Sequence, residues 1–447
     1  MTSATTALAN VSLDDKYALE KGWVFLTGTQ AMVRLPMLQR QRDQAAGLNT
    51  GCYISGYRGS PLGAFDQQLW QAKPFLEKNH IVFQPGVNED MAATAVWGSQ
   101  QLNLGPQSKY DGVYGIWYGK APGVDRCGDV VRHANHAGTD PNGGVLMMCG
   151  DDHAAVSSTV PGQSEHNLAS WMVPMLYPAG VQEYLDYGLL GWAMSRYAGV
   201  WVGFKCVSEV VESSASVDVD AHRLDIQYPD FEMPEGGLNI RWPDDRWSQE
   251  IRLQRHKVYA ALAFARANGI DRLVWNAPKP RIGIVAAGKS YLDTRQALED
   301  LGIDEAMAAQ IGLRLYKVGM PWPLEREGVR AFAEGLDEVL VIEEKRAVIE
   351  NQLKEQLYNW RADVRPRVVG KFDEEGQLLC PSDGELSPGQ IARIIMSRIG
   401  SYVSSPTIEE RMAQLDRKEA AAQTAVAPIQ RAPYFCSGCP HNTSTKV

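Results

Sequence analysis

Residues 53–63 read Tyr53-Ile-Ser-Gly-Tyr-Arg-Gly-Ser-Pro-Leu-Gly63, and residues 85–92 read Pro85-Gly-Val-Asn-Glu-Asp-Met-Ala92. The first stretch predicts a strand that ends at Gly56 and breaks into a tight glycine- and proline-containing loop. In the second, Asn88 is predicted to cap a helix, which places Glu89 in the first turn, where the helix dipole favours negative charge. The two stretches thus set a carboxylate against a glycine-rich loop. Taken alone, the second stretch is better explained by an ordinary capped helix.

The region around these stretches, from about residue 20 to 250, alternates short β-rich runs with amphipathic helical segments. The clearest runs are residues 112–118, 143–149 and 199–206. Strand, loop, helix and strand in this order indicate an α/β fold with a parallel sheet. Polar, glycine-containing loops follow the strands at Gly56, at Gly119-Lys120 and at Gly150-Asp-Asp-His153. Because ligands of open α/β sheets bind at the carboxyl ends of the strands, this edge is the predicted site.

A second, smaller α/β unit is predicted to begin near residue 276. Its expected strands are residues 282–287, 313–318 and 338–342, and its expected helices are residues 291–301 and 324–334. The predicted organisation is a tail (1–19), a first domain (20–275), a second domain (276–365), a connector and linker (366–432), and the start of a further domain (433–447). An aromatic pair and a Cys-x-x-Cys-Pro-His turn follow the linker, so we expect the chain to be part of a longer polypeptide.

Charge and composition exclude several classes of protein. The chain has 44 basic and 53 acidic residues, a formal charge of -9, which argues against a nucleic-acid partner. The N-terminus has no basic flank and apolar run of a secretory signal, and the apolar stretch 189–204 is interrupted by Ser195 and Arg196. We therefore expect a cytoplasmic protein without a membrane span. The seven cysteines are scattered, and Cys436 and Cys439 alone have the spacing of metal ligands.

Residues 283–290, Gly-Ile-Val-Ala-Ala-Gly-Lys-Ser, fit the phosphate-loop pattern of nucleotide hydrolases. In a phosphate loop the strand precedes the first glycine, whereas here Ile-Val-Ala-Ala is itself the best strand of the region. A P-loop-type nucleotide hydrolase is therefore the weaker alternative. A non-catalytic docking module is a third interpretation.

Two polar segments that follow strands are further candidates for the site. Residues 118–126 offer Lys120 and Arg126 as anchors for a carboxylate. Residues 150–158 concentrate polar groups after a strand, and a solvated surface loop explains them equally well. Cys436 and Cys439 supply half of a tetrahedral metal site, and the chain contains no second pair.

In order along the chain from about residue 16 to 447, these motifs resemble the long, single-chain form of indolepyruvate ferredoxin oxidoreductase. This family belongs to the thiamine diphosphate-dependent 2-oxoacid:ferredoxin oxidoreductases. The resemblance rests on YISGYRGSPLG, PGVNEDMAATAVWGSQ, YGKAPGVDR, GDDHAAVSS, GIVAAGKSYLD, VIEEKR and FCSGCPHNTS. It implies a pyrimidine-binding thiamine-fold domain followed by a smaller transketolase C-terminal-like domain, with a diphosphate-binding domain beginning near Cys436.

The resemblance also implies roles for particular residues. Glu89 matches the catalytic acid that hydrogen-bonds the pyrimidine ring of thiamine diphosphate. The other implied cofactor-binding residues are Arg58, Gly59, Ser60, Pro61, Asn88, Asp152, His153 and Ser157. Cys436 and Cys439 match a Cys-x-x-Cys that helps to bind an iron–sulfur cluster in some relatives.

The implied activity is oxidative decarboxylation of indolepyruvate and other aryl or branched 2-oxo acids, with the acyl group passing to coenzyme A and the electrons to ferredoxin. Such enzymes use Mg²⁺ to hold the diphosphate, commonly through a Gly-Asp-Gly motif with a later Asn, and no Gly-Asp-Gly occurs in these 447 residues. The chain is therefore expected to supply one side of the site and to be inactive alone. The expected partners are the diphosphate-binding and gamma-like domains of the same polypeptide, ferredoxin and a second copy of the chain.

Overall fold

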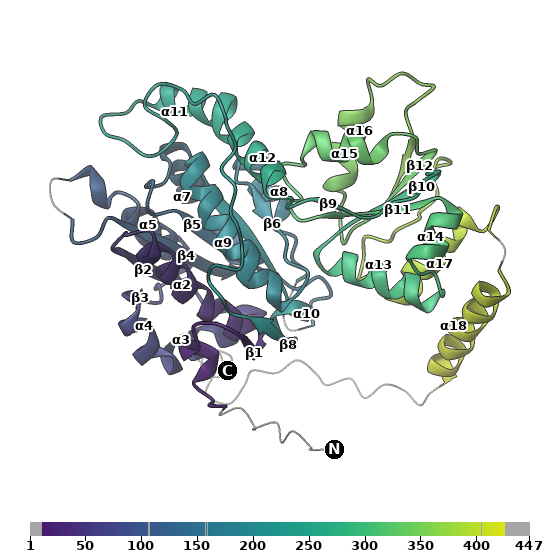
Figure 1. The fold of residues 1–447 in the computed structure, drawn as a ribbon, viewed down its shortest axis with the longest axis horizontal. Coiled ribbons are helices and arrows are strands. Elements are labelled where there is room, and N and C mark those ends of the chain that lie inside the picture. The colour runs from purple at the N-terminus through teal and green to yellow at the C-terminus, as the bar shows by residue number, and fades with distance from the viewer. Residues whose placement is uncertain (1–10, 106–107, 157, 159, 404, 425–447) are drawn as a thin grey trace, which may run out of the picture.

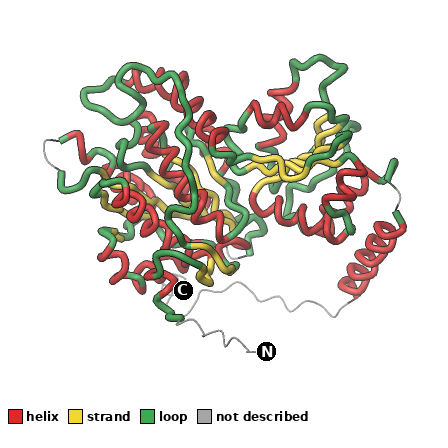
Figure 2. The backbone as a smooth tube through the Cα atoms, viewed as in Figure 1, coloured by secondary structure: helices red, strands yellow, loops and turns green. Residues whose placement is uncertain are grey.

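The computed structural model describes residues 11–105, 108–156, 158, 160–403 and 405–424. They form two α/β units, with the first in purple to teal and the second in green to yellow in Figure 1. Figure 2 shows that each unit has a layer of strands covered by helices. This arrangement confirms the predicted α/β class, with a smaller second unit after a parallel-sheet unit.

The first unit is built on a six-stranded sheet with the order β3-β2-β4-β5-β7-β6, in which every pair is parallel. The strands are β2 (Thr50–Gly56), β3 (Ile81–Phe83), β4 (Gly112–Lys120), β5 (Val145–Asp151), β6 (Met175–Leu176) and β7 (Trp201–Val207). A separate antiparallel pair joins β1 (Trp23–Thr27) to β8 (Ser214–Asp218). Strands β5 and β7 are buried along their whole length, as expected for a parallel sheet that is covered on both faces.

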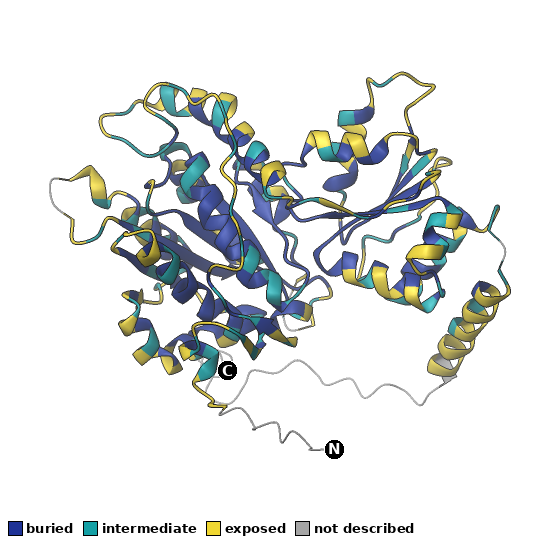
Figure 3. Ribbon diagram, viewed as in Figure 1, coloured by how far each residue is buried: buried dark blue, intermediate teal, exposed yellow. Residues whose placement is uncertain are grey.

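Helices cover both faces of this sheet. Strand β4 shows the alternation, since Tyr114, Ile116 and Tyr118 join the core beneath α2 and α9, whereas Trp117 joins the core beneath α5 and α7. The helices of the first unit are α1 (Asp15–Ala18), α2 (Gly28–Ala45), α3 (Phe65–Gln71), α4 (Lys73–Lys78), α5 (Glu89–Ser99), α6 (Ala121–Arg126), α7 (Gly128–Ala137), α8 (Glu165–Ser170), α9 (Val181–Ala198), α10 (Ser208–Val211), α11 (Arg246–Arg252) and α12 (Val258–Ala267), with short helical turns η1 (Leu62–Ala64), η2 (Leu102–Leu104) and η3 (Leu253–Lys257). Figure 3 shows the strands as the buried centre of each unit.

The second unit has a five-stranded sheet with the order β13-β12-β10-β11-β9, in which β9 alone runs antiparallel. The strands are β9 (Arg272–Trp275), β10 (Ile282–Ala287), β11 (Leu313–Val318), β12 (Glu338–Ile342) and β13 (Arg367–Val369). The helices are α13 (Gly288–Asp300), α14 (Glu305–Ile311), α15 (Arg326–Ala333), α16 (Ile349–Leu357), α17 (Pro388–Ile399) and α18 (Pro406–Thr424).

The second unit is larger than the 276–365 expected from the sequence. Strand β9 lies before residue 276 and pairs with β11. Residues after 366, expected to be a connector, supply β13 to the sheet and α17 to the hydrophobic core, where Ile391 and Ile395 are fully buried. These segments belong to the unit because they complete its apolar core.

The two units contact each other through backbone and side chains. The amides of Met175 and Tyr177 in the first unit donate to the carbonyls of Trp322 and Gly319 in the second, at 2.7 and 2.9 Å. At Gly288, which has a positive φ of 50°, an added Cβ would lie 2.1 Å from the Tyr177 ring. A glycine is therefore required where α13 approaches the first unit. None of the described helices is long and apolar enough to cross a membrane.

Candidate functional site

The loop after β2 lies over the carboxyl edge of the six-stranded sheet. Its backbone begins with a hydrogen bond from the Tyr57 amide to the Tyr118 carbonyl, 3.1 Å. A Cβ added at Gly59 would lie 2.7 Å from Cδ of Lys120, and one added at Gly150 would lie 3.0 Å from Cδ of Pro61. The strand therefore ends at Gly56, as predicted, and its loop packs across the ends of β4 and β5.

Glu89 is the first residue of α5 and is 9% exposed. The predicted cap is confirmed, since the Asn88 side chain accepts a hydrogen bond from the Met91 amide at 2.9 Å. The indole of Trp117 donates to the backbone carbonyl of Glu89, 3.1 Å. A Cβ added at Gly123 would lie 2.8 Å from Oε1 of Glu89. The carboxylate therefore lies against the first turn of α6, at the same sheet edge as the β2 loop.

Two cations near this edge are paired with acids. Arg58 contacts Asp66 at 3.3 Å, and Asp66 is almost completely buried. Arg126 contacts Asp90 at 2.6 Å. Arg58, Gly59, Pro61 and Glu89 are thus brought to one edge, while the cofactor-binding roles assigned to them remain predictions.

The loop after β5 is organised around Asp152. Asp152 accepts hydrogen bonds from the amides of Val156 and Ser158, both at 2.9 Å, so it caps its own loop. His153 is 2% exposed, and neither of its ring nitrogens has a hydrogen-bond partner among the described residues. Burial, followed by the charges of Lys205, Lys345, Lys289 and Lys371, holds the pKa of His153 well below its usual value. Ser157, Cys436 and Cys439 lie outside the described residues.

A buried ion cluster lies beneath this loop and was not predicted from the sequence. Lys205 of β7 is fully buried and contacts Asp151 at 3.1 Å and Glu165 more closely. Burial lowers the pKa of Lys205, but Glu165 and Asp151 more than offset this effect, so its pKa lies above the usual value. Asp151 also accepts hydrogen bonds from the amide and hydroxyl of Ser164. The cluster ties both ends of the 152–164 loop to the sheet.

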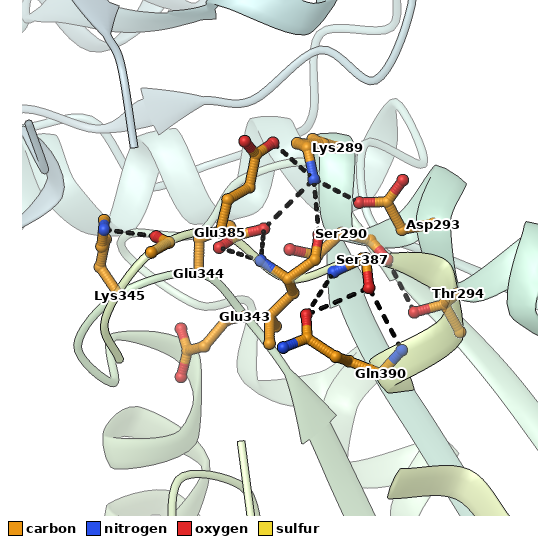
Figure 4. Close-up of polar contacts among 12 residues, drawn as sticks. Lys289, Ser290, Asp293, Thr294, Glu343, Glu344, Lys345, Glu385, Ser387 and Gln390 are labelled. Atoms are coloured by element: carbon orange, nitrogen blue, oxygen red, sulfur yellow. Dashed lines mark hydrogen bonds and ion pairs between the residues drawn. The ribbon is translucent and has the colours of Figure 1, made fainter. Parts of the chain in front are cut away.

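The Gly-Lys-Ser segment of the second unit does not form a phosphate loop. Residues 282–287 form strand β10, and a Cβ added at Gly283 would lie 2.4 Å from the Phe332 ring. Figure 4 shows Lys289 among three carboxylates, at 2.5 Å from Asp293, 3.4 Å from Glu344 and 2.8 Å from Glu385. The charge of the lysine is thus already satisfied by acids.

We expect the chain to show no ATP binding. A strand occupies the place of the phosphate-cradling loop, and the acids around Lys289 would repel a triphosphate. Isothermal titration calorimetry with millimolar MgATP is expected to give only the heat of dilution. Saturable binding in that range would contradict this expectation.

The second unit matches a known protein family. Residues 271–426 match the family model described as the indolepyruvate ferredoxin oxidoreductase middle domain. The match begins at β9 and includes β13 and α17, in agreement with the extent of the second unit. The resemblance to indolepyruvate ferredoxin oxidoreductase is confirmed.

The curated relatives match most of the chain. Indolepyruvate oxidoreductase subunit IorA of Pyrococcus horikoshii is 24% identical over 94% of this chain and 58% of its own length. The subunit IorA of Methanothermobacter marburgensis is 24% identical over 96% of this chain and 61% of its own length. The chain therefore spans about three fifths of the length of these relatives.

A solved structure supports the fold. The 2-oxoglutarate:ferredoxin oxidoreductase of Magnetococcus marinus, with 2-oxoglutarate, coenzyme A and succinyl-CoA bound, aligns with a TM-score of 0.56 and 13% identity. The alignment covers 85% of this chain and 66% of that one. At this identity the likeness concerns the fold.

Proposed function

We propose that this chain is part of a thiamine diphosphate-dependent 2-oxoacid:ferredoxin oxidoreductase that acts on indolepyruvate and other aryl or branched 2-oxo acids. The observation that carries the proposal is the position of Glu89. Its side chain is nearly buried in the first turn of α5, lies against Gly123, and shares the carboxyl edge of the sheet with the β2 loop. The similarity to the indolepyruvate oxidoreductase relatives supports the substrate class.

The described residues fit one side of a thiamine site. The close approach of Gly123 leaves no room for a side chain beside the Glu89 carboxylate, and the β2 loop lies over the ends of β4 and β5. Thiamine diphosphate, when bound, supplies the carbon nucleophile that attacks the 2-oxo group. Glu89 would hold a proton at its carboxylate for the pyrimidine ring, and its burial keeps water from competing for that hydrogen bond.

The other cofactors would be bound by another part of the protein. Among the described residues, no group of three or more His, Cys, Asp and Glu side chains could hold a metal ion. The curated relatives are longer than the matched region. We propose that their additional length corresponds to the domains that bind the diphosphate with Mg²⁺ and the iron–sulfur clusters.

The proposed reaction releases the carboxyl group of the 2-oxo acid as CO₂ and oxidises the carbonyl carbon by two electrons. The acyl group forms a thioester with coenzyme A. The two electrons reduce two ferredoxins, and iron–sulfur clusters bound by the additional domains would carry them. In this scheme the chain binds the pyrimidine side of the cofactor and the 2-oxo acid, while electron transfer occurs elsewhere in the complete polypeptide.

The complete polypeptide is expected to convert indolepyruvate to indoleacetyl-CoA with one reduced ferredoxin for each electron released. Anaerobic assays that follow ferredoxin reduction and CO₂ release check this, and omission of thiamine diphosphate is expected to abolish both. Residues 1–447 alone are expected to show no turnover with a dye acceptor. Failure of the complete polypeptide to oxidise any aryl or branched 2-oxo acid would refute the proposal.

A further inference from the structure

The Glu89 carboxylate accepts no hydrogen bond and forms no ion pair within the described part of the chain. The nearby cations Arg58 and Arg126 pair with Asp66 and Asp90 instead. A carboxylate without a partner can bind a ligand, but its position is then set by the backbone that carries it. The contacts that hold the first turn of α5 therefore decide where this carboxylate lies.

Trp117 ties the first turn of α5 to the sheet. It lies on β4, is fully buried, and belongs to the core beneath α5 and α7. Its indole N–H donates to the backbone carbonyl of Glu89 at 3.1 Å. The Asn88 cap bonds the helix to itself, because its side chain accepts from the amide of Met91. The indole thus joins the turn that carries Glu89 to the strand beneath it.

The segment that follows the same strand also limits the position of the carboxylate. Helix α6 begins directly after β4, and a Cβ added at Gly123 would lie 2.6 Å from Cγ and 2.8 Å from Oε1 of Glu89. Strand β4 lies between β2 and β5 in the six-stranded sheet. The backbone and the carboxylate of Glu89 are therefore both placed by β4 and the helix that follows it.

We propose that the Trp117 indole positions Glu89 for proton transfer to the pyrimidine ring of the cofactor, a role that rests on the proposed function. Trp117 is a positioning residue, because it acts through the backbone carbonyl of Glu89. Without the indole donor, the first turn of α5 can move relative to Gly123, and the carboxylate moves with it. A displacement of about 1 Å at a reacting group can lower the rate about 100-fold.

Trp192 provides a matched control on the same strand. Its indole is also fully buried and donates to the backbone carbonyl of Gly115 of β4, again at 3.1 Å. It comes from α9 and lies in the core on the other face of the sheet. Loss of this donor removes the same kind of hydrogen bond from β4 but leaves the contact with Glu89 in place.

The test replaces Trp117 and Trp192, one at a time, in the complete polypeptide. Each is changed to Phe and, separately, to benzothienylalanine, which keeps the shape of tryptophan with sulfur in place of the N–H and so leaves no cavity. Both Trp117 variants are expected to lower kcat with phenylpyruvate about 10- to 100-fold, with KM changed less than about twofold. Both Trp192 variants are expected to change kcat less than about twofold.

A double-mutant cycle separates positioning from a general structural role. In the Glu89→Gln background, Trp117→Phe is expected to lower kcat less than about twofold, because the acid that it positions is already absent. Deuterium exchange at C2 of bound thiamine diphosphate, followed by NMR without any 2-oxo acid, is expected to slow by the same factor as kcat in the Trp117 variants.

Backbone amide exchange in residues 1–447 without cofactor gives a readout that does not depend on activity. Loss of one hydrogen bond should speed the exchange of the amides in the first two turns of α5 about 3- to 10-fold in Trp117→Phe. In Trp192→Phe these amides should exchange at the native rate.

Three results would overturn the assignment. They are equal losses of kcat in the Trp117 and Trp192 variants, the same fold-loss for Trp117→Phe with and without Glu89, and an unchanged kcat with benzothienylalanine at position 117. The C2 exchange separates this proposal from the proposed function. If the native polypeptide accelerates this exchange but oxidises no aryl or branched 2-oxo acid, the proposed function fails, and the exchange rates of the variants decide the role of Trp117. If it does not accelerate the exchange, both fail.

Discussion

Glu89→Gln is expected to lower kcat of the complete polypeptide with an aryl 2-oxo acid about 100- to 10,000-fold, the range found for loss of a positioned acid or base. The amide has the size of the acid but cannot hold or return a proton at this position. The fold should survive, because the Trp117 indole bonds to the backbone carbonyl of Glu89 and the Asn88 cap is untouched. Steady-state ferredoxin reduction measures the loss, and thermal unfolding of residues 1–447 checks the fold.

The neighbouring Asp90→Asn is the matched control, since it makes the same chemical change one residue further along α5. Asp90 pairs with Arg126, and both side chains are partly exposed. A pair of this kind contributes less than about 1 kcal/mol, so activity should change less than about twofold. Near-normal turnover by Glu89→Gln would contradict the proposed role of this residue. An equal loss of activity in both variants would indicate that the substitutions disturb the first turn of α5.

The features of the site that could be predicted from the sequence depend on local chemistry. The end of β2 at Gly56 and the cap at Asn88 follow from the residues themselves, because glycine ends a strand and an asparagine side chain satisfies a free helix amide. The strand at 282–287 could likewise be recognised inside a phosphate-loop pattern by its apolar, β-rich composition. These signals need no knowledge of distant neighbours.

The extent of the second unit could not be predicted in the same way. Strands β9 and β13 have four and three residues, and two residues of β9 are exposed. Such short segments show no clear hydrophobic periodicity. Strand β9 pairs with β11, and β13 pairs with β12, so each pairing involves a partner strand that is distant in the sequence. The family model places the boundary at residue 271, which agrees with the strand pairing.

The buried ion cluster has one recognisable signal in the sequence. Lys205 lies inside the run 199–206, one of the β-rich runs of the predicted parallel sheet. A lysine in a strand covered on both faces must have a partner, because an unpaired buried charge is costly. Its partners Asp151 and Glu165 could not be identified, since they come from another strand and a helix. The lysines whose charges lower the pKa of His153 likewise come from distant parts of the sequence.

Lys205→Met is expected to destabilise residues 1–447 by about 3–5 kcal/mol, because it leaves two carboxylates in a site that water does not reach. Equilibrium unfolding in urea measures this change in the free energy of unfolding. Lys73→Met is the control, since Lys73 and Glu77 are more than half exposed and 3.7 Å apart, and a change below about 0.5 kcal/mol is expected. A similar small effect for Lys205→Met would show that the cluster contributes little.

The pH dependence and a second substitution identify the cause of this destabilisation. Without Lys205, two buried carboxylates have no cation that balances their charge. Protonation at low pH removes unpaired negative charge from this site. The deficit should therefore be smaller at pH 4–5 than at pH 8.

Lys205→Met combined with Glu165→Gln should recover more than half of the deficit, because Asp151 keeps the two hydrogen bonds from Ser164, at 3.1 and 2.7 Å. A deficit that does not vary with pH and is not relieved by Glu165→Gln would mean that lost packing of the lysine stem, not unpaired charge, destabilises the variant. Because Lys205 ties the β5 loop to the sheet, this comparison also tests whether the loop that carries Asp152 and His153 is held by charge.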